Sequence, residues 1–176
     1  MNGISNSLKV IKAFAQNPRH SNIIAIGGDS PSYFLYDLRN VSKPILEVCQ
    51  HANSVVQLLF NCYFDQLILS TSVDGHAVVT NTNLDNYSKL PFDYSTLNVL
   101  NDLTYELADD CFLVNDVPLN PLMNAAWMEN DPFKISIIDS DGIIGVHEMS
   151  QKHRNLMIDS VSKRSLEFTV LTTDSN

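Results

Sequence analysis

Three segments of the chain follow one pattern, and this repetition constrains the fold more than any other feature of the sequence. Each segment is a short apolar run, then a turn that contains an aspartate, then a second apolar run, as in a β-hairpin. A single repeat of this kind cannot bury its apolar face alone, so the pattern predicts stacked copies of one small sheet. The segments are IIAIGGDSPSYFLYDLR (residues 23–39), LILSTSVDGHAVVTNTN (67–83) and FKISIIDSDGIIGVHEM (133–149).

The spacing of the turns matches that of WD40 blades. Asp29 and Asp74 are 45 residues apart, within the ~40–45 residues of one blade. Asp74 and Asp141 are 67 residues apart, which corresponds to one period plus an insertion. Tyr36-Asp37 stands where such a repeat usually has Trp-Asp at the end of its third strand. The sequence therefore predicts an all-β fold, a partial WD40 β-propeller of about three blades, each an antiparallel four-stranded sheet.

The repeats also predict boundaries along the chain. Residues 1–155 are expected to form the partial propeller, with blades at about 8–50, 51–84 and 110–150. An acidic insertion is expected at 84–120, where the carboxylates are accompanied by a single cation, Lys89. Within it, residues 111–114 are expected to form a strand that returns the chain to the sheet. Residues 156–176 are a C-terminal extension, in which 166–172 is a candidate closing strand.

A histidine ahead of the second repeat predicts a polar network within that blade. WD40 repeats often carry a histidine at the end of the preceding strand, and here that residue is His51. It can reach Asp74 in the hairpin turn and a strand hydroxyl among residues 70–72, which ties the loops of the blade together. The structural network predicted from these positions and from the other two turns consists of His51, Asp74, Ser72, Asp29 and Asp141.

The stretch IDSDGIIGVHE (138–148) also matches the end of an EF-hand calcium loop. The first ligand position of that loop would be Ile137, whose aliphatic side chain cannot bind calcium. The flanking segments are rich in β-formers, whereas an EF-hand needs helices. The first two repeats lack a glutamate at the place of Glu148. The hairpin turn of a blade is therefore the favoured interpretation, and the sequence predicts no metal site and no cofactor.

Composition and charge narrow the classes of function. A hydrophobic content of 44% and a charged content of 18% are typical of a globular chain. The net charge of -9 repels phosphate backbones, so nucleic acid is not an expected partner. The sequence has no apolar run long enough for direct membrane insertion, and residues 1–10 lack the apolar region that a signal peptide would need. Cys49, Cys62 and Cys111 are scattered, which suits a reducing compartment and predicts a cytoplasmic location.

The sequence lacks the motifs of common catalytic sites. It contains no phosphate-binding glycine loop, H-E-x-x-H, C-x-x-C or G-x-S-x-G. Cys49 and His51 are close in sequence, but an activated nucleophile needs a third partner, which the pattern does not supply. The sequence therefore predicts that the chain is not an enzyme.

One run of residues resembles a known family of WD-repeat proteins. The run is DLRNVSKPILEVCQHANSVVQLLFNCYFDQLILSTSVDGHAVVTN (37–81), followed by the acidic insertion and then by Ala126-Trp127, Asp131-Pro132-Phe133 and Asp141-Gly142. In this order it is similar to the C-terminal blades of the EARP- and GARP-complex-interacting WD-repeat protein family. The similarity covers about residues 10–155.

The resemblance implies a function and a location. It implies a non-catalytic interaction scaffold that associates with subunits of the tethering complexes EARP and GARP. Such a scaffold would assist endosomal recycling and endosome-to-Golgi retrieval. The resemblance also implies a cytoplasmic protein at the trans-Golgi network and endosomes.

A second function has support from a shorter motif. Tyr36-Asp37-Leu38-Arg39 resembles the WDxR box through which substrate receptors of cullin-RING ubiquitin ligases meet their adaptor. The residues Asp37 and Arg39 are therefore the candidate partner contacts. Short motifs of this kind recur by chance in many propellers, so the scaffold is favoured and the ligase receptor is the alternative.

Apolar positions on the predicted blade faces bear on the oligomeric state. Propellers typically close with about four to eight blades, and this chain supplies fewer. Ile24, Ile26, Val78 and Ile144 would then lie on uncovered faces, and exposed apolar surface drives association. The chain is therefore expected to self-associate or to need a companion propeller fragment.

Overall fold

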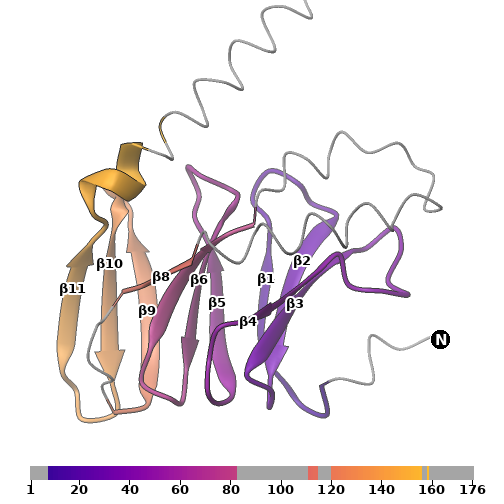
Figure 1. Ribbon diagram of the computed structural model, residues 1–176, viewed down its shortest axis with the longest axis horizontal. Coiled ribbons are helices and arrows are strands. Elements are labelled where there is room, and N and C mark those ends of the chain that lie inside the picture. Colours follow the sequence, from indigo (N-terminus) through magenta and orange to yellow (C-terminus); the bar gives the residue numbers. More distant parts are fainter. Residues whose placement is uncertain (1–7, 83–110, 115–119, 156–157, 159–176) are drawn as a thin grey trace, which may run out of the picture.

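The structure, a computed structural model, describes residues 8–82, 111–114, 120–155 and 158. Within these residues every strand belongs to one of three antiparallel sheets, which stand side by side in chain order (Figure 1). The first sheet is β1 (Ile11–Gln16), β2 (Ile23–Gly28), β3 (Ser32–Asp37) and β4 (Leu46–Cys49). The second is β5 (Val55–Phe60), β6 (Leu67–Ser72), β7 (Ala77–Asn81) and β8 (Cys111–Leu113). The third is β9 (Leu122–Met128), β10 (Asp131–Asp139) and β11 (Ile144–Glu148). The predicted all-β class is confirmed, and its sheets are arranged as expected of a partial propeller.

The strand β8 lies in the second sheet. The expected third blade at 110–150 included this segment, but β8 pairs with β7, with Leu113 opposite Val78 and Cys111 opposite Thr80. The physical reason is that β7 would otherwise present an unpaired edge, and lengthening the connecting loop adds little entropic cost. The remainder of the acidic insertion, 84–110 and 115–119, and the candidate closing strand at 166–172 lie outside the described residues.

The stretch that matches an EF-hand forms a hairpin turn. It lies between β10 and β11, which pair in antiparallel register, and Ile137 is a buried strand residue. Gly142 has a φ of 81°, and Gly75 in the second sheet has a φ of 82° at the corresponding turn. Glycine adopts this left-handed conformation without strain. The hairpin interpretation is confirmed.

The core lies in the two junctions where the sheets pack face to face. Strands β2, β3 and β6 are buried at every position because both of their faces are covered, and such strands show no alternation of polar and apolar residues. Strand β5 contacts β1 on one side and β9 on the other, so these strands are neighbours across the junctions. Residues of the first junction include Tyr33, Leu35, Val55 and Ile68. Residues of the second junction include Leu69, Val79, Ile135 and Ile137.

The expectation of uncovered apolar faces is wrong for three of its four residues. Ile24 and Ile26 are buried in a third apolar cluster on the first sheet. Val78 is also buried, because it lies on the same face of the second sheet as Ile68, which belongs to the first junction. Ile144 is 70% exposed, as expected. Exposed large apolar side chains lie on the first sheet as well as on the third, with Phe14 62% exposed and Val146 62% exposed.

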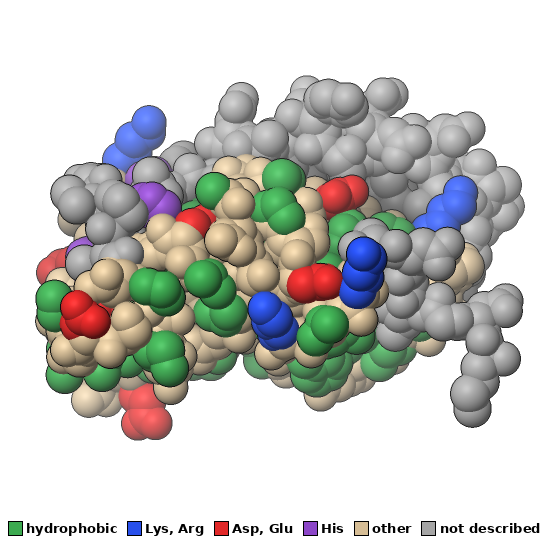
Figure 2. All heavy atoms as spheres, turned by 90° about the horizontal axis from the view of Figure 1, so that it is seen from below, with side chains coloured by type: hydrophobic (Ala, Val, Ile, Leu, Met, Phe, Trp, Pro, Cys, Tyr) green, Lys and Arg blue, Asp and Glu red, His purple; other side chains and the backbone are tan. Residues whose placement is uncertain are grey.

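The described surface offers no single large charged patch in the view from below. Hydrophobic side chains there are interspersed with a few separate charged ones (Figure 2). No helix among the described residues is long and apolar enough to cross a bilayer.

Candidate functional site

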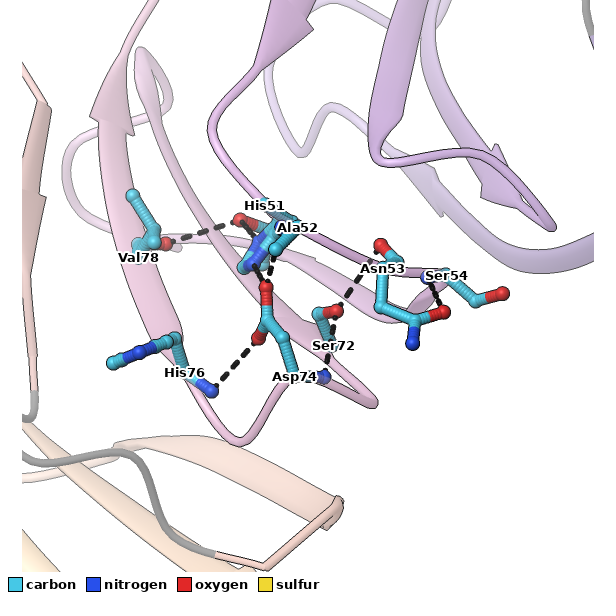
Figure 3. Close-up of polar contacts among 9 residues, drawn as sticks. His51, Ala52, Asn53, Ser54, Ser72, Asp74, His76 and Val78 are labelled. Carbon is cyan, nitrogen blue, oxygen red and sulfur yellow. Dashed lines mark hydrogen bonds and ion pairs between the residues drawn. The ribbon is translucent and has the colours of Figure 1, made fainter.

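The hairpin turn between β6 and β7 is built around one aspartate. The N–H of Gly75 closes the turn by donating to the Ser72 carbonyl at 3.2 Å. The Asp74 carboxylate accepts hydrogen bonds from the backbone amides of Ala52, at 2.8 Å, and His76, at 2.9 Å. One carboxylate thus joins its own turn to the loop that precedes β5 (Figure 3).

His51 lies in that loop with both ring nitrogens engaged. Its Nδ1 is 3.3 Å from Asp74 Oδ2, and its Nε2 is 2.8 Å from Ser70 Oγ. The His51 side chain is fully buried and that of Asp74 is 9% exposed. The structure thus brings together two of the residues singled out in the sequence, and the hydroxyl that faces the imidazole is Ser70 rather than Ser72.

The protonation of the pair follows from burial and from the partners. Burial lowers the pKa of His51, and the attraction of Asp74 offsets only part of this effect. The imidazole is then neutral at pH 7, and Nδ1 carries its hydrogen because a carboxylate can only accept. Burial alone would raise the pKa of Asp74, but the amides of Ala52 and His76 stabilise the carboxylate and hold that pKa below its usual value.

This arrangement ties loops together. A buried imidazole with both nitrogens occupied offers no free lone pair to a substrate, so the chemistry of the site is structural. Val73 adds to it by donating its N–H to the Ser54 carbonyl at 3.1 Å. The result is a rigid rim on the second sheet, on which exposed loop residues can be presented.

Replacing His51 or Asp74 by alanine is expected to lower the free energy of unfolding. Each change leaves a buried polar partner unsatisfied, at a cost of roughly 1–3 kcal/mol. The double variant should cost less than the sum of the two, since the residues share one network. The free energy of unfolding of all three variants is measured by urea denaturation. Asp29→Ala, at an exposed turn aspartate, is the control and should change stability by less than about 0.5 kcal/mol. Strict additivity of the two single changes would show that the side chains do not interact.

Stability is expected to fall as the pH is lowered from 7.5 to 5.5. His51 has a folded pKa below its ordinary 6.5, so the unfolded chain binds more protons as the pH falls through that value. Its contribution is therefore complete above 6.5 and is lost below it. The pKa of Asp74 is held below its ordinary value by the amides of Ala52 and His76, so this carboxylate does not titrate in this window. His51→Gln should reduce the difference between the urea midpoints at the two pH values. An unchanged difference would mean that His51 is not buried as a neutral group.

Ser72 supports the same turn in a different way. Its hydroxyl accepts a hydrogen bond from the Asp74 N–H at 3.1 Å and donates one to the Asn53 carbonyl at 3.1 Å. Ser70 lies two residues before Ser72 on the same face of β6, where its hydroxyl contacts the imidazole of His51. The sequence could not distinguish these two hydroxyls, because both project from the same side of β6.

Asp29 and Asp141 are exposed turn residues whose carboxylates contact segments about 20 residues earlier in the chain. Asp29 Oδ1 accepts a hydrogen bond from the N–H of Lys9 at 3.1 Å. Asp141 Oδ2 accepts one from the side-chain amide of Asn120 at 2.7 Å. The structure does not bring either carboxylate into the network of His51.

In the third sheet the turn is held by Asp139, a residue that sequence reasoning missed. It is buried, and its Oδ1 accepts hydrogen bonds from the amides of Asp141, at 3.0 Å, and Ile143, at 2.9 Å. Asp139 stands two residues before Asp141, as Ser72 stands two residues before Asp74. Aligning the Asp-Gly pairs of the two turns would have identified it.

Asp37 and Arg39, the candidate partner contacts, bind one another. Asp37 is buried at the end of β3, and Arg39 Nε is 2.9 Å from both of its carboxylate oxygens. The backbone N–H of Arg39 also donates to Asp37 Oδ1 at 2.8 Å. The Arg39 side chain is 41% exposed. A partner that contacts Arg39 must therefore share the guanidinium with Asp37.

Two asparagines that sequence reasoning missed link neighbouring sheets. Asn17, directly after β1, donates its side-chain amide to the Asp65 carbonyl at 2.8 Å. Asn61, directly after β5, donates to the Pro132 carbonyl at 2.8 Å. In each case the amide also caps its own turn, with its oxygen accepting two backbone N–H groups. The sequence did contain a signal for these links, because an asparagine directly follows the first strand in both of the first two sheets.

Comparison with known proteins adds an independent finding. No protein-family model matches the chain. EARP-interacting protein 1 of Caenorhabditis elegans is 26% identical over 140 residues, which cover 78% of this chain and 39% of that protein. EARP and GARP complex-interacting protein 1 of Homo sapiens is 23% identical over 143 residues, 76% of this chain and 36% of that protein. The predicted resemblance is confirmed. A shorter match, 30% identical over 74 residues, is to histone acetyltransferase type B subunit 2 of Candida glabrata and covers 42% of this chain.

The matches also define the scale of the similarity. The chain spans little more than a third of the length of the EARP-interacting relatives, although they match over three quarters of its own length. These relatives are named as interacting proteins.

Proposed function

We propose that this chain is a non-catalytic WD-repeat scaffold that binds the tethering complexes EARP and GARP. The observation that carries the proposal is the similarity, over three quarters of the chain, to proteins named for their interaction with these complexes. In this proposal the protein acts in the cytoplasm at the trans-Golgi network and endosomes, in endosomal recycling and endosome-to-Golgi retrieval.

The geometry supports a scaffold. The sheets stack through apolar faces, and the buried polar groups of the second sheet hold its loops in place. We assign the blades to 8–50 and 51–84, with β8 added to the second, and a third from 120 to 150. The WD-repeat assignment is supported by the order of the strands in each sheet and by the contact of His51 with the turn aspartate.

Affinity capture tests the proposal against the ligase alternative. The tagged chain is expressed in cultured cells, and the captured proteins are identified by mass spectrometry. Arg39→Ala is the matched variant, because Arg39 belongs to the box that a ligase adaptor would contact. We expect tether subunits to be captured equally by both proteins. Capture of a cullin-RING adaptor that is lost with Arg39→Ala, without tether subunits, would overturn the proposal.

A further inference from the structure

Strand β11 forms an open edge of the third sheet. Among the described residues that sheet ends at β11, which stands at the far end of the row of sheets (Figure 1). Open edges in natural sheets are usually blunted by lysine, proline or a β-bulge. The sequence of β11 is IGVHE, and it pairs with β10 without a register shift, so it has none of these features. It can therefore serve as a template for another strand.

The opposite edge of the same sheet is closed by a side chain of the second sheet. The Ala125 N–H of β9 donates to Gln57 Oε1 at 2.7 Å, and Gln57 Nε2 donates to the Ala125 carbonyl at 3.1 Å. The amide of Gln57 thus occupies both backbone groups that a further strand would need at this position. An incoming strand therefore finds its place at β11 and not at β9.

The backbone of β11 points in the right direction for such a strand. The Asp139 N–H donates to the Ile143 carbonyl at 3.1 Å, which makes this a hydrogen-bonded pair of the β10–β11 ladder. Hydrogen-bonded and non-hydrogen-bonded pairs alternate along antiparallel strands. Ile144, Val146 and Glu148 are therefore non-hydrogen-bonded positions of that ladder, and their N–H and C=O groups point away from β10.

The side chains of β11 add an apolar column to the open edge. Ile144 and Val146 lie on one face of the sheet, because they are two residues apart on a strand. Ile144 is 70% exposed and Val146 is 62% exposed. The residues at the same distances from the turn glycine of the second sheet, Ala77 and Val79, are 0% exposed. The third sheet thus presents apolar side chains and outward backbone groups at one place.

We propose that this edge pairs with β11 of a second copy of the chain, antiparallel and about a twofold axis between the two Gly145 residues. Ile144 then lies opposite Val146 of the second copy, and Val146 lies opposite Ile144 of the second copy. Each of these pairs exchanges two backbone hydrogen bonds, because both of its members have outward N–H and C=O groups. The two three-stranded sheets become one sheet of six strands.

Charge and side-chain size select this register. The apolar side chains of the two copies form one continuous column across the junction. Glu148 lies opposite Gly142 of the second copy, a turn residue without a side chain, so the two glutamates do not face each other. A shift that placed Val146 opposite itself would put the Glu148 carboxylate opposite Ile144, and burial of a charge beside an apolar side chain is unfavourable.

A second copy is the occupant because the edge is complementary to itself. An isologous contact brings the same residues together from both sides, so an apolar edge meets an apolar edge of equal length. The outer edges of the other two sheets are less suitable, because β4 exposes Glu47 and Cys49 and β8 is three residues long. Paired edges alone bury less than the roughly 1,200 Å² of a stable interface, so the dimer is expected to be weak and to depend on concentration.

The association state of the full chain tests the proposal and does not depend on tether binding. Sedimentation velocity over a range of concentrations should show a reversible monomer–dimer equilibrium. Hydrogen exchange measured by NMR should slow for the amides of Ile144 and Val146 by about tenfold or more between conditions where the monomer and the dimer dominate. A monomer at every concentration would overturn the proposal. Protection of these amides that does not change with concentration would also overturn it, by identifying a segment of the same chain at the edge.

Val146→Asp should weaken the dimer by about tenfold or more, because it places a charge in the apolar column. Phe14→Asp is the matched control, since Phe14 is also 62% exposed but lies on β1 of the first sheet. It should leave the association unchanged. Loss of the dimer with Phe14→Asp and not with Val146→Asp would assign the contact to the first sheet and overturn the proposal.

Ile144→Pro keeps the proposal testable if Val146→Asp fails to fold. The substitution removes the outward N–H of Ile144 and no hydrogen bond to β10, and proline is tolerated on edge strands at such positions. Circular dichroism should show a folded chain, and sedimentation should show that the dimer is lost. A dimer as strong as that of the unmodified chain would contradict backbone pairing at β11.

Discussion

Replacing Gly28 by alanine is expected to destabilise the chain more than the same replacement of Gly27, Gly142 or Gly145. A Cβ at Gly28 would lie 1.8 Å from the Val10 carbonyl oxygen, and the atom in the way is backbone. The close approach arises because Gly28 pairs with Ile11 at the start of β1, beside a register shift. The strand β1 would have to move, at a cost of about 3 kcal/mol in the free energy of unfolding.

Gly142→Ala is the matched control for this prediction. It adds the same methyl group to an open turn, where a Cβ would meet nothing within 4 Å. The only cost is the positive φ of 81°, which should amount to about 1 kcal/mol. Urea unfolding of both variants gives the comparison. Equal losses of stability would mean that β1 does not pass so close to Gly28.

Replacing Leu69 by alanine is expected to weaken the junction of the second and third sheets. Leu69 is 0% exposed and packs in one cluster with Ile135 and Ile137 of the third sheet. The substitution removes buried methyl groups and leaves a cavity, at a cost of about 2–5 kcal/mol. Met123→Ala is the control, because Met123 is 66% exposed. It should cost less than about 0.5 kcal/mol.

The same pair of variants tests whether the sheets unfold together. Thermal unfolding is followed by far-ultraviolet circular dichroism and by the fluorescence of Trp127, which lies against the second junction. We expect Leu69→Ala to lower both transitions equally. A fall in the fluorescence transition alone would show that the third sheet unfolds separately from the other two sheets.

The elements that sequence could predict are those set by local pattern. The hairpins around Asp74 and Asp141 follow from apolar runs that flank an Asp-Gly turn, and they are present with almost identical glycine conformations. The contact of His51 with Asp74 could be predicted from the spacing of the repeats, which places the end of β4 beside the turn between β6 and β7. Ser70 could not be chosen over Ser72, because only the depth of the imidazole in the sheet decides between them.

The elements that sequence could not predict depend on contacts between distant segments. Strand β8 is only three residues long, and a long connection separates it in sequence from β7, the strand with which it pairs. The amide of Asn61 reaches the Pro132 carbonyl only because the second and third sheets lie next to each other. The burial of Ile24 likewise depends on its packing with Phe34 and Tyr36 on one face of the first sheet. The pattern of apolar residues along its own strand does not reveal this packing.

Binding of purified EARP complex to the isolated chain tests the central claim most directly. The chain and the human EARP and GARP complex-interacting protein 1 are titrated side by side, after circular dichroism has shown that both are folded. We expect saturable binding by both, with a weaker affinity for this chain, because it corresponds to 36% of the human protein and presents only part of its surface. Saturable binding by the human protein and none by the folded chain, at concentrations far above the Kd of the human protein, would contradict the claim.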